Sequence, residues 1–459
     1  MDPSVPVLVF DNGAHSIKST FTSTSDPYAS ISPDKISVFR NAIVRSKTEK
    51  RVYVADEWDQ CQDFGGLTFR VPMDKGILNN WDIEKQVWDR VLSGRGRSIK
   101  VDPRSSSIAI TEPMMNLPNV QEHYDQMIFE EYEFQNYLRV PGPVAVPYGL
   151  DARGSLQNPL PECCLVIDAG FSFTHVVPIL RGAVISSGVK RIDIGGKLLT
   201  NYLKELVSYR HWYMMDQTSV MEHAKEQACY VTTRWEHDWE AANVNTNNQV
   251  VRTYVLPDFT PESSNKLGYV RTGQTPPPRP PTPPQTDQGS GYAQPEAPQD
   301  EEQLLYLCNE RFTVPEVLFN PTTIELNQAG LVESIANAIN TLPYELRGMF
   351  WSNIVCVGGS AGFEGFGPRL EKDLRSLAPT EHTVKVTISA SPTTTIASCL
   401  SIAMSPPFLL QPTSYSQGPL RDSFVTRQEY QESGSSACRR KFARFYWSDK
   451  GLESELNRG

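Results

Sequence analysis

One short stretch near the start of the chain combines residue types that can surround a phosphate group. In VLVFDNGAHSIKSTF, residues 7–21, an apolar run ends in Asp11, and Gly13 and Lys18 follow. Glycine lets the backbone reverse tightly, and the N–H groups of such a turn can form a concave site for phosphate oxygens. A carboxylate at this position can hold the hydrated Mg²⁺ that accompanies a nucleotide. An ordinary β-hairpin has the same pattern, so this stretch alone predicts only the hairpin.

A second stretch repeats the arrangement later in the chain. In CCLVIDAGFSFTHVVPIL, residues 163–180, Asp168 ends an apolar run and Gly170 follows two positions later. Two such hairpins that face each other across a cleft would hold phosphate groups from both sides. The pair is therefore a stronger indication of a phosphate site than either hairpin alone.

A third glycine cluster, NIVCVGGSAGFEGFGPRLEKDLRSL, covers residues 353–377 and contains Gly358, Gly359 and Ser360. A buried strand precedes the glycines, and apolar residues at helical spacing follow them, with proline at the helix start. Strand, glycine turn and helix form the geometry by which a backbone approaches a nucleotide closely. The elements that must position these clusters are buried strands, with a helix after the third cluster.

Composition limits the classes of function. The chain has 459 residues, enough for two or three domains, and its net charge of −10 leaves no basic stripe that would bind nucleic acid directly. Its eight cysteines are scattered without a CxxC pair, which favours reduced thiols inside the cell and argues against a zinc site. We find neither a signal peptide nor an apolar run of about 20 residues, and we expect a soluble protein that is not secreted.

One segment departs from globular composition. Residues 271–303 are rich in Pro, Gln, Gly and acidic residues and include PPPRPPTPP. Such a segment cannot bury enough apolar surface to offset its ordering entropy, so we expect a disordered insert within a domain. Recognition of its polyproline II conformation by SH3 or WW domains is an open alternative.

With these units in order, the chain resembles the actin family, and within it the nuclear actin-related proteins. The match covers nearly the whole chain apart from the insert and the last residues, and the stretches that carry it are FDNG, GILNNWDIEKQVW (76–88), KEQACYV (225–231), NERFTVPEVLFNP (309–321) and TRQEYQESGSSACRRKF (426–442). The resemblance implies an actin-like α/β fold of two lobes, each a duplicated arrangement of sheet and helices, around a nucleotide cleft. Residues 1–149 with 391–459 would form the smaller lobe and residues 150–390 the larger one.

The resemblance also implies ATP as the bound cofactor, with Mg²⁺ left open. The residues that match the family's nucleotide-binding positions are Asp11, Gly13, Lys18, Asp168, Gly170, Lys225, Glu226, Gly358, Gly359 and Ser360. We assign no catalytic residue and no protein-held metal site.

The phosphate loops depart from the family pattern. The family has a serine and a glycine where this chain has Ala14 and His15, and an acid and a glycine where it has Phe171 and Ser172. The first change removes a hydroxyl donor and adds a bulky ring. An alternative to a bound nucleotide is therefore a cleft that is empty or filled by His15 and Phe171.

The two connections between the lobes depart as well. The glutamine that orients the attacking water in actin falls at Gly142, and residues 391–401, SPTTTIASCLS, lack the lysine and paired glycines that actin uses beside the adenine. Phosphoryl transfer depends mainly on positioning and electrostatic stabilisation. We therefore expect ATP to be bound but not hydrolysed, and we expect the protein not to be an enzyme.

Filament formation is not expected either. Actin inserts a long loop of its smaller lobe into the next subunit, whereas this chain has only the six polar residues 46–51 there. Residues 314–326 match another filament contact, but they suit core packing equally well.

The resemblance implies a scaffold subunit of an SWR-type remodelling complex, which exchanges a variant histone into nucleosomes. Its implied partners are the motor subunit, a small zinc-finger subunit, other subunits of the complex and the nucleosome, without a membrane or a self-filament. The implied location is the nucleus, with the cytoplasm left open. A filament-forming cytoskeletal ATPase is the alternative function.

Two aromatic stretches lie outside these motifs. Trp235 and Trp239 have the i, i+4 spacing of a helix and are expected to pack along one of its faces, with His237 in solvent. Residues 209–216, YRHWYMMD, suit an interface patch or core packing equally well.

Overall fold

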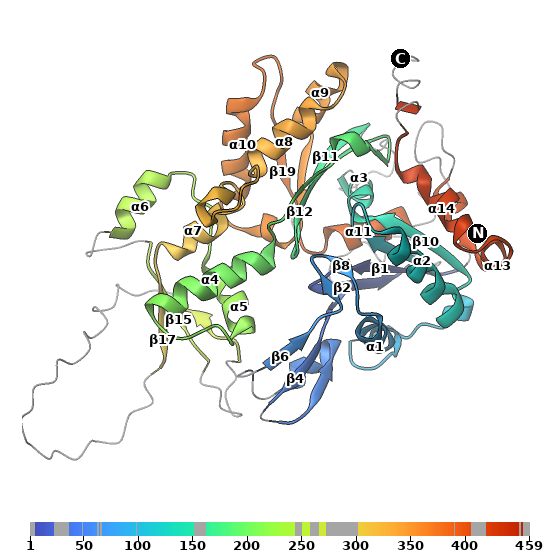
Figure 1. Ribbon diagram of the computed structural model, residues 1–459, viewed down its shortest axis with the longest axis horizontal. Coiled ribbons are helices and arrows are strands. Elements are labelled where there is room, and N and C mark those ends of the chain that lie inside the picture. The colour runs from blue at the N-terminus through green and yellow to red at the C-terminus, as the bar shows by residue number, and fades with distance from the viewer. Residues whose placement is uncertain are drawn as a thin grey trace, which may run out of the picture.

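The computed structural model contains two large sheets with helices between and around them (Figure 1). It describes residues 5–22, 36–47, 49–61, 64, 67–97, 99–150, 162–243, 250–257, 266–271, 302–389, 391–404, 419–448 and 451–452. Residues 272–301, nearly all of the predicted insert, lie outside these ranges, so its disorder stays a prediction.

The first sheet has the order β20-β10-β9-β1-β2-β3. Its strands are β20 (Val425–Thr426), β10 (Asn136–Pro141), β9 (Ser107–Glu112), β1 (Val7–Asn12), β2 (Ser16–Phe21) and β3 (Ser37–Arg40). The second sheet has the order β13-β12-β11-β18-β19, with β14 paired to β12. Its strands are β13 (Ala183–Val184), β12 (Thr174–Leu180), β11 (Cys163–Ala169), β18 (Ile354–Val357), β19 (Val386–Ile388) and β14 (Lys190–Ile192).

The two sheets share one topology. In the first, β3, β2 and β1 are antiparallel neighbours, and β1, β9 and β10 are parallel. In the second, β14, β12 and β11 are antiparallel, and β11, β18 and β19 are parallel. The predicted duplicated α/β architecture is therefore confirmed. One predicted hairpin is the β1–β2 pair of the first sheet, and the other is the β11–β12 pair of the second.

Three smaller sheets extend from this frame. They are β5-β4-β6 (Val52–Val54, Ile43–Ser46, Leu67–Arg70), β16-β15-β17 (Tyr269–Val270, Arg252–Val255, Leu304–Leu307) and β7-β8 (Met73–Asp74, Ile77–Leu78). Strands β4 and β5 are joined by the short connection predicted from residues 46–51.

Helices pack against the two sheets, and the central strands β1, β9, β10, β11, β12 and β18 are buried along nearly their whole length. Those of the first sheet's half are α1 (Trp81–Leu92), α2 (Pro118–Gln126), α3 (Pro147–Leu150), α11 (Thr395–Ala403), α13 (Arg427–Ser433) and α14 (Ser435–Phe442). Those of the second are α4 (Gly196–Arg210), α5 (Thr218–Ala228), α6 (Trp235–Asn243), α7 (Glu310–Glu316), α8 (Leu331–Asn340), α9 (Tyr344–Trp351) and α10 (Phe366–Leu377). No helix in the described part of the chain is long and apolar enough to cross a membrane.

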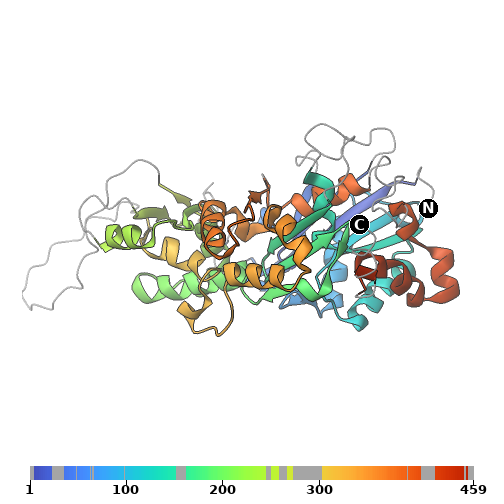
Figure 2. The same cartoon turned by 90° about the horizontal axis from the view of Figure 1, so that it is seen from above.

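The buried residues form two large apolar cores, and the chain is elongated along the direction that joins them (Figure 2). Alternate residues of β11 enter different cores: Val166 packs in the first, and Leu165 and Ile167 pack in the second. Leu452, which the predicted division assigns to the smaller lobe, packs in the second core. The lobe boundaries themselves stay a prediction.

Candidate functional site

The two hairpins present equivalent residues at the same register positions. Asp11 lies opposite Lys18 across β1 and β2, and Asp168 lies opposite His175 across β11 and β12. Lys18 Nζ is 3.2 Å from Asp11 Oδ2, and the Thr111 hydroxyl donates to Asp11 Oδ1 at 2.8 Å. Each hairpin therefore has an aspartate near the end of its first strand, and in the first hairpin the Lys18 ammonium lies beside that aspartate.

Electrostatics favour a positive partner between the two aspartates. Burial and the nearby charge of Asp11 raise the pKa of Asp168 to about 7. A cation between the two side chains would favour the ionised form of Asp168. The described residues contain no group of three metal-ligating side chains, so any ion here would depend on its ligand and water for coordination.

His175 offers a polar atom that the protein itself does not use. The ring is 1% exposed, and its Nε2 has no hydrogen-bond partner among the described residues. Burial and the charge of Arg191 lower its pKa to about 4, so the ring is neutral at pH 7. A buried polar nitrogen normally has a partner, and a ligand oxygen or a water in the cleft would supply one.

The glycines are required by close backbone approach. Gly358 has a φ of +89°, and a Cβ there would lie 2.4 Å from the Ala169 carbonyl oxygen. A Cβ on Gly13 would lie 2.8 Å from the Ser16 carbonyl oxygen and 3.2 Å from Lys18 Nζ. The third glycine turn therefore packs directly on the end of β11, as the predicted phosphate arrangement needs.

The predicted adenosine-side pair lies on α5. Lys225 is buried, and its ammonium donates to the Gly196 carbonyl at 3.1 Å and to Thr200 Oγ1 at 2.9 Å, while burial lowers its pKa. Glu226 is exposed toward the same cavity. The lysine therefore positions the start of α4, and the glutamate is the more accessible of the two.

All ten predicted site residues line one cavity of about 340 Å³. They come from four separate segments, namely the two hairpins, α5 and the turn after β18. Phe363, Pro392 and Thr393 also line it, although none of them is among the ten predicted site residues. The glycine turns, Lys18 and the unpartnered His175 nitrogen fit the phosphates of a nucleotide, and the role of each residue in binding stays a prediction.

The two hairpin turns are joined directly by side chains. The rings of His15 and Phe171 lie with their centroids 4.9 Å apart, tilted by 56°. His15 Nε2 is 2.8 Å from Glu222 Oε1 and 2.6 Å from Arg40 Nη1, and Arg40 is 2.7 Å from Glu222 Oε2. We call these four residues the inter-lobe bridge, because His15 and Arg40 belong to the first sheet and Phe171 and Glu222 to the second half.

The charges of the inter-lobe bridge are strongly coupled. Burial alone would raise the pKa of Glu222, but His15 and Arg40 outweigh it and hold that pKa well below its usual range. Burial and the charge of Arg40 lower the pKa of His15. The sequence analysis missed Glu222 and Arg40, although Glu222 lies three residues before Lys225 on the same helix face, a spacing that could have indicated it.

The first connection between the sheets offers no polar side chain to the cleft. Gly142 and the next residue, Pro143, both line the cavity. Neither can hydrogen-bond a water through its side chain.

Comparisons with known proteins agree with this geometry. A family model described as Actin matches residues 2–443. The chain is 43% identical to an Actin-like protein ARP6 of Cryptococcus neoformans over 96% of this chain and 85% of that protein. It is 36% identical to Actin-related protein 6 of Drosophila melanogaster, over 84% of this chain and 89% of that protein, and 34% identical to Actin-related protein 6 of Oryza sativa, over 95% and 98%.

The family match covers nearly all of the chain, and the relatives are similar to it over both halves of the cleft. This protein belongs to the actin family, and its relatives within that family are actin-related proteins of the ARP6 type.

Proposed function

We propose that this chain is a non-catalytic, ATP-binding scaffold subunit of an SWR-type chromatin-remodelling complex, which exchanges a variant histone into nucleosomes. The carrying observation is a cleft that keeps the glycine turns and aspartates of a phosphate site but joins the two turns through its own side chains. The similarity to ARP6-type relatives supports the placement among nuclear actin-related proteins.

Nucleotide binding would rest on the ten predicted residues. Lys18 and the glycine turns would hold phosphate oxygens, and Asp11 and Asp168 would face a hydrated Mg²⁺ if one accompanies the nucleotide. Phe363 and Pro392 provide apolar surface for the base. A bound nucleotide would add charge and hydrogen-bond acceptors between the lobes and so stabilise their closed arrangement.

The absence of hydrolysis is proposed from the side chains that face the cleft. Gly142 and Pro143 cannot orient a water, and the His15 and Phe171 rings lie between the turns where a terminal phosphate would need donors. His175 is neutral at pH 7, and no described carboxylate contacts its free nitrogen. ATP would therefore serve as a structural ligand.

The scaffold role would use surfaces outside the cleft. Tyr209, Trp212 and Tyr213 at the end of α4 are 93%, 52% and 72% exposed, so the stretch 209–213 is surface and not core. Exposed aromatic clusters are typical of protein interfaces. The proposed partners are the remodeller's motor subunit, a small zinc-finger subunit, other subunits of the complex and, within the assembly, the nucleosome.

One experiment tests both parts of this proposal. The tagged full chain is purified from nuclei of its own organism, its partners are identified by mass spectrometry, and bound nucleotide is quantified in the same sample. Recovery of a Snf-type motor, AAA+ helicases and a small zinc-finger subunit, with about one ATP per chain, is the expected result. Recovery alone or with cytoplasmic filament proteins would contradict the scaffold role, and steady phosphate release at actin-like rates would contradict the absence of hydrolysis.

A further inference from the structure

Helix α6 carries two tryptophan side chains that are not buried in the apolar core. The helix lies at the outer end of the second half in both views (Figures 1 and 2), and none of its residues is buried. The rings of Trp235 and Trp239 stack at 6.1 Å with an interplanar angle of 15°, and the rings of Trp235 and Phe312 are nearly perpendicular, with centroids 5.2 Å apart. Trp239 is 43% exposed. The expected packing of both tryptophans along one face is thus only partly right, because the face that carries Trp239 is open to solvent.

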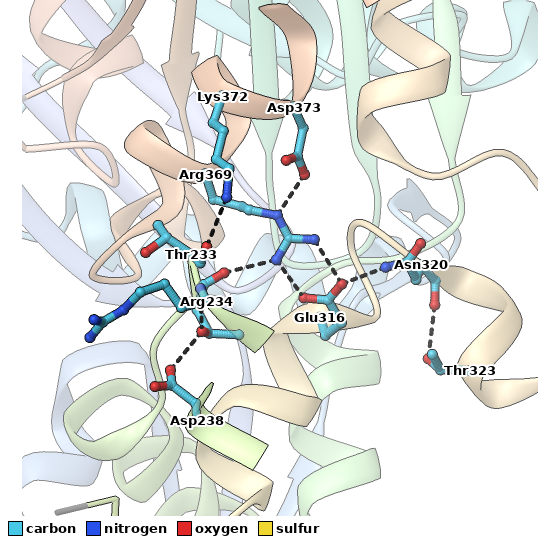
Figure 3. Close-up of polar contacts among 10 residues, drawn as sticks. Thr233, Arg234, Asp238, Glu316, Asn320, Thr323, Arg369, Lys372 and Asp373 are labelled. Carbon is cyan, nitrogen blue, oxygen red and sulfur yellow. Dashed lines mark hydrogen bonds and ion pairs between the residues drawn. The ribbon is translucent and has the colours of Figure 1, made fainter. Parts of the chain in front are cut away.

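The position of this helix is held by a polar network at its start (Figure 3). Arg369 and Lys372, both on α10, donate to the carbonyl oxygens of Thr232 and Thr233 at 2.8 and 3.1 Å. The Thr232 hydroxyl donates in turn to Asp238 Oδ2, on α6, at 2.6 Å. These hydrogen bonds hold α6 and its exposed rings in place, which lowers the entropic cost of binding a partner.

Arg369 is itself fixed by carboxylates. Its guanidinium reaches Glu316 at 3.0 Å on α7 and Asp373 at 2.5 Å on its own helix (Figure 3). The same arginine thus links α7, α10 and the segment before α6.

The exposed face of α6 is also acidic. Trp235, Glu236, Trp239 and Glu240 line a shallow hollow of about 270 Å³. The helix has no lysine or arginine, and Asp238 is engaged by the hydroxyls of Thr232 and Tyr230. The hollow therefore combines aromatic faces with two carboxylates that face solvent.

We propose that this hollow docks a basic peptide segment of a partner protein, with a lysine or arginine side chain over the Trp239 ring and the two glutamates beside it. A cation is attracted to the face of an indole ring and to a carboxylate, so both features favour the same ligand. Nucleic acid phosphates would be repelled by the glutamates. An apolar peptide would have to desolvate both carboxylates, and a second copy of α6 would bring like charges together.

The test uses the full-length protein and a synthetic peptide of twelve residues in which lysine and serine alternate. Binding is measured by calorimetry and by tryptophan fluorescence, beside peptides with glutamate or leucine in place of lysine. Trp239→Ala is expected to weaken binding of the lysine peptide about tenfold. The double variant Glu236→Gln, Glu240→Gln is expected to weaken it as well and to reduce its salt dependence.

Tyr344→Ala is the matched control, because Tyr344 is also an exposed aromatic residue but lies at the start of α9. It is expected to bind the lysine peptide as the unaltered protein does, and Trp239→Phe is expected to keep part of the affinity. Equal binding by Trp239→Ala and Tyr344→Ala would overturn the proposal, as would equal affinity for the leucine peptide. No binding of the lysine peptide at millimolar concentration would overturn it too.

Discussion

The His15 ring occupies space in the cleft that the terminal phosphate of a nucleotide would need. Its ring lies against Phe171 and between the charges of Glu222 and Arg40, so the gap between the two hairpin turns is spanned by protein atoms. A nucleotide that reaches this gap must displace the ring or stop short of it. At the scale of single residues, His15 therefore limits the room for the terminal phosphate of the proposed ATP.

We expect His15→Ala to raise the affinity for ATP relative to ADP by about tenfold, because the vacated space admits the third phosphate to charge-assisted hydrogen bonds. The measurement is competition of unlabelled ATP and ADP against a fluorescent nucleotide. His382→Ala, at a histidine after α10, is the control and is expected to leave the ratio unchanged. An unchanged ratio in His15→Ala would show that the ring does not limit the site.

At the scale of elements, a buried carboxyl joins α1 to the first hairpin strand. Glu84 is 0% exposed, and its Oε1 accepts from Asn12 Nδ2 at 2.6 Å and from Trp88 Nε1 at 3.2 Å. Burial raises its pKa to about 7, against an ordinary value of 4.5. Asn12 follows Asp11 directly, so this network supports the base of the phosphate turn.

The raised pKa predicts a pH dependence of stability. The folded state keeps a proton on Glu84 that the unfolded chain releases, so this contribution is full below about pH 4.5 and declines as the pH rises to about 7. We expect Glu84→Gln to be more stable than the unaltered protein at pH 8, by on the order of 3 kcal/mol at most, and to differ little from it at pH 5.

Urea unfolding at the two pH values measures this difference. Glu371→Gln, at an exposed position of α10, is the control and should change stability little at either pH. A Glu84→Gln variant that is destabilised equally at pH 5 and pH 8 would contradict the protonated state of Glu84.

At the scale of the whole molecule, the inter-lobe bridge holds the two halves together through the protein's own side chains. Glu222 contacts His15 and Arg40 with both of its oxygens and is buried. Removing one partner of a buried ion pair leaves the other charge uncompensated. We therefore expect the bridge to stabilise the closed arrangement when no nucleotide is bound.

We expect small-angle scattering to give the same radius of gyration for the unaltered protein before and after ATP is added. The Glu222→Gln variant is expected to have a larger radius of gyration than the unaltered protein when nucleotide is absent. Glu381→Gln, in the exposed loop after α10, is the matched control. Compaction of the unaltered protein on adding ATP would mean that the nucleotide, and not the bridge, closes the lobes.

The whole molecule is also expected not to polymerise. The connection between β4 and β5 is short, and Val314 and Leu318, in the stretch that matches another filament contact, are buried. Sedimentation at high protein concentration with ATP and Mg²⁺ should leave the protein in the supernatant, with actin as the positive control. ATP-dependent pelleting would contradict this expectation and favour the cytoskeletal alternative.

Sequence alone determined the two hairpins and the glycine turns. Each of these depends on local chemistry: an apolar run forms a buried strand, and a glycine permits the turn that follows Asp11 or Asp168. The long matches to the actin family then placed the separate turns around one cleft. These features were predictable because each needs only residues that are close in the chain or a fold that is already known.

Tertiary structure alone decided which side chains meet across the cleft and which remain outside. Arg40 and Glu222 are 182 positions apart, and their contact depends on how α5 lies beside the end of β3 and not on any local pattern. The i, i+4 spacing of Trp235 and Trp239 predicted a shared face but not whether a neighbour covers it. Helical periodicity sets which residues point together, whereas burial depends on what the rest of the fold brings against them.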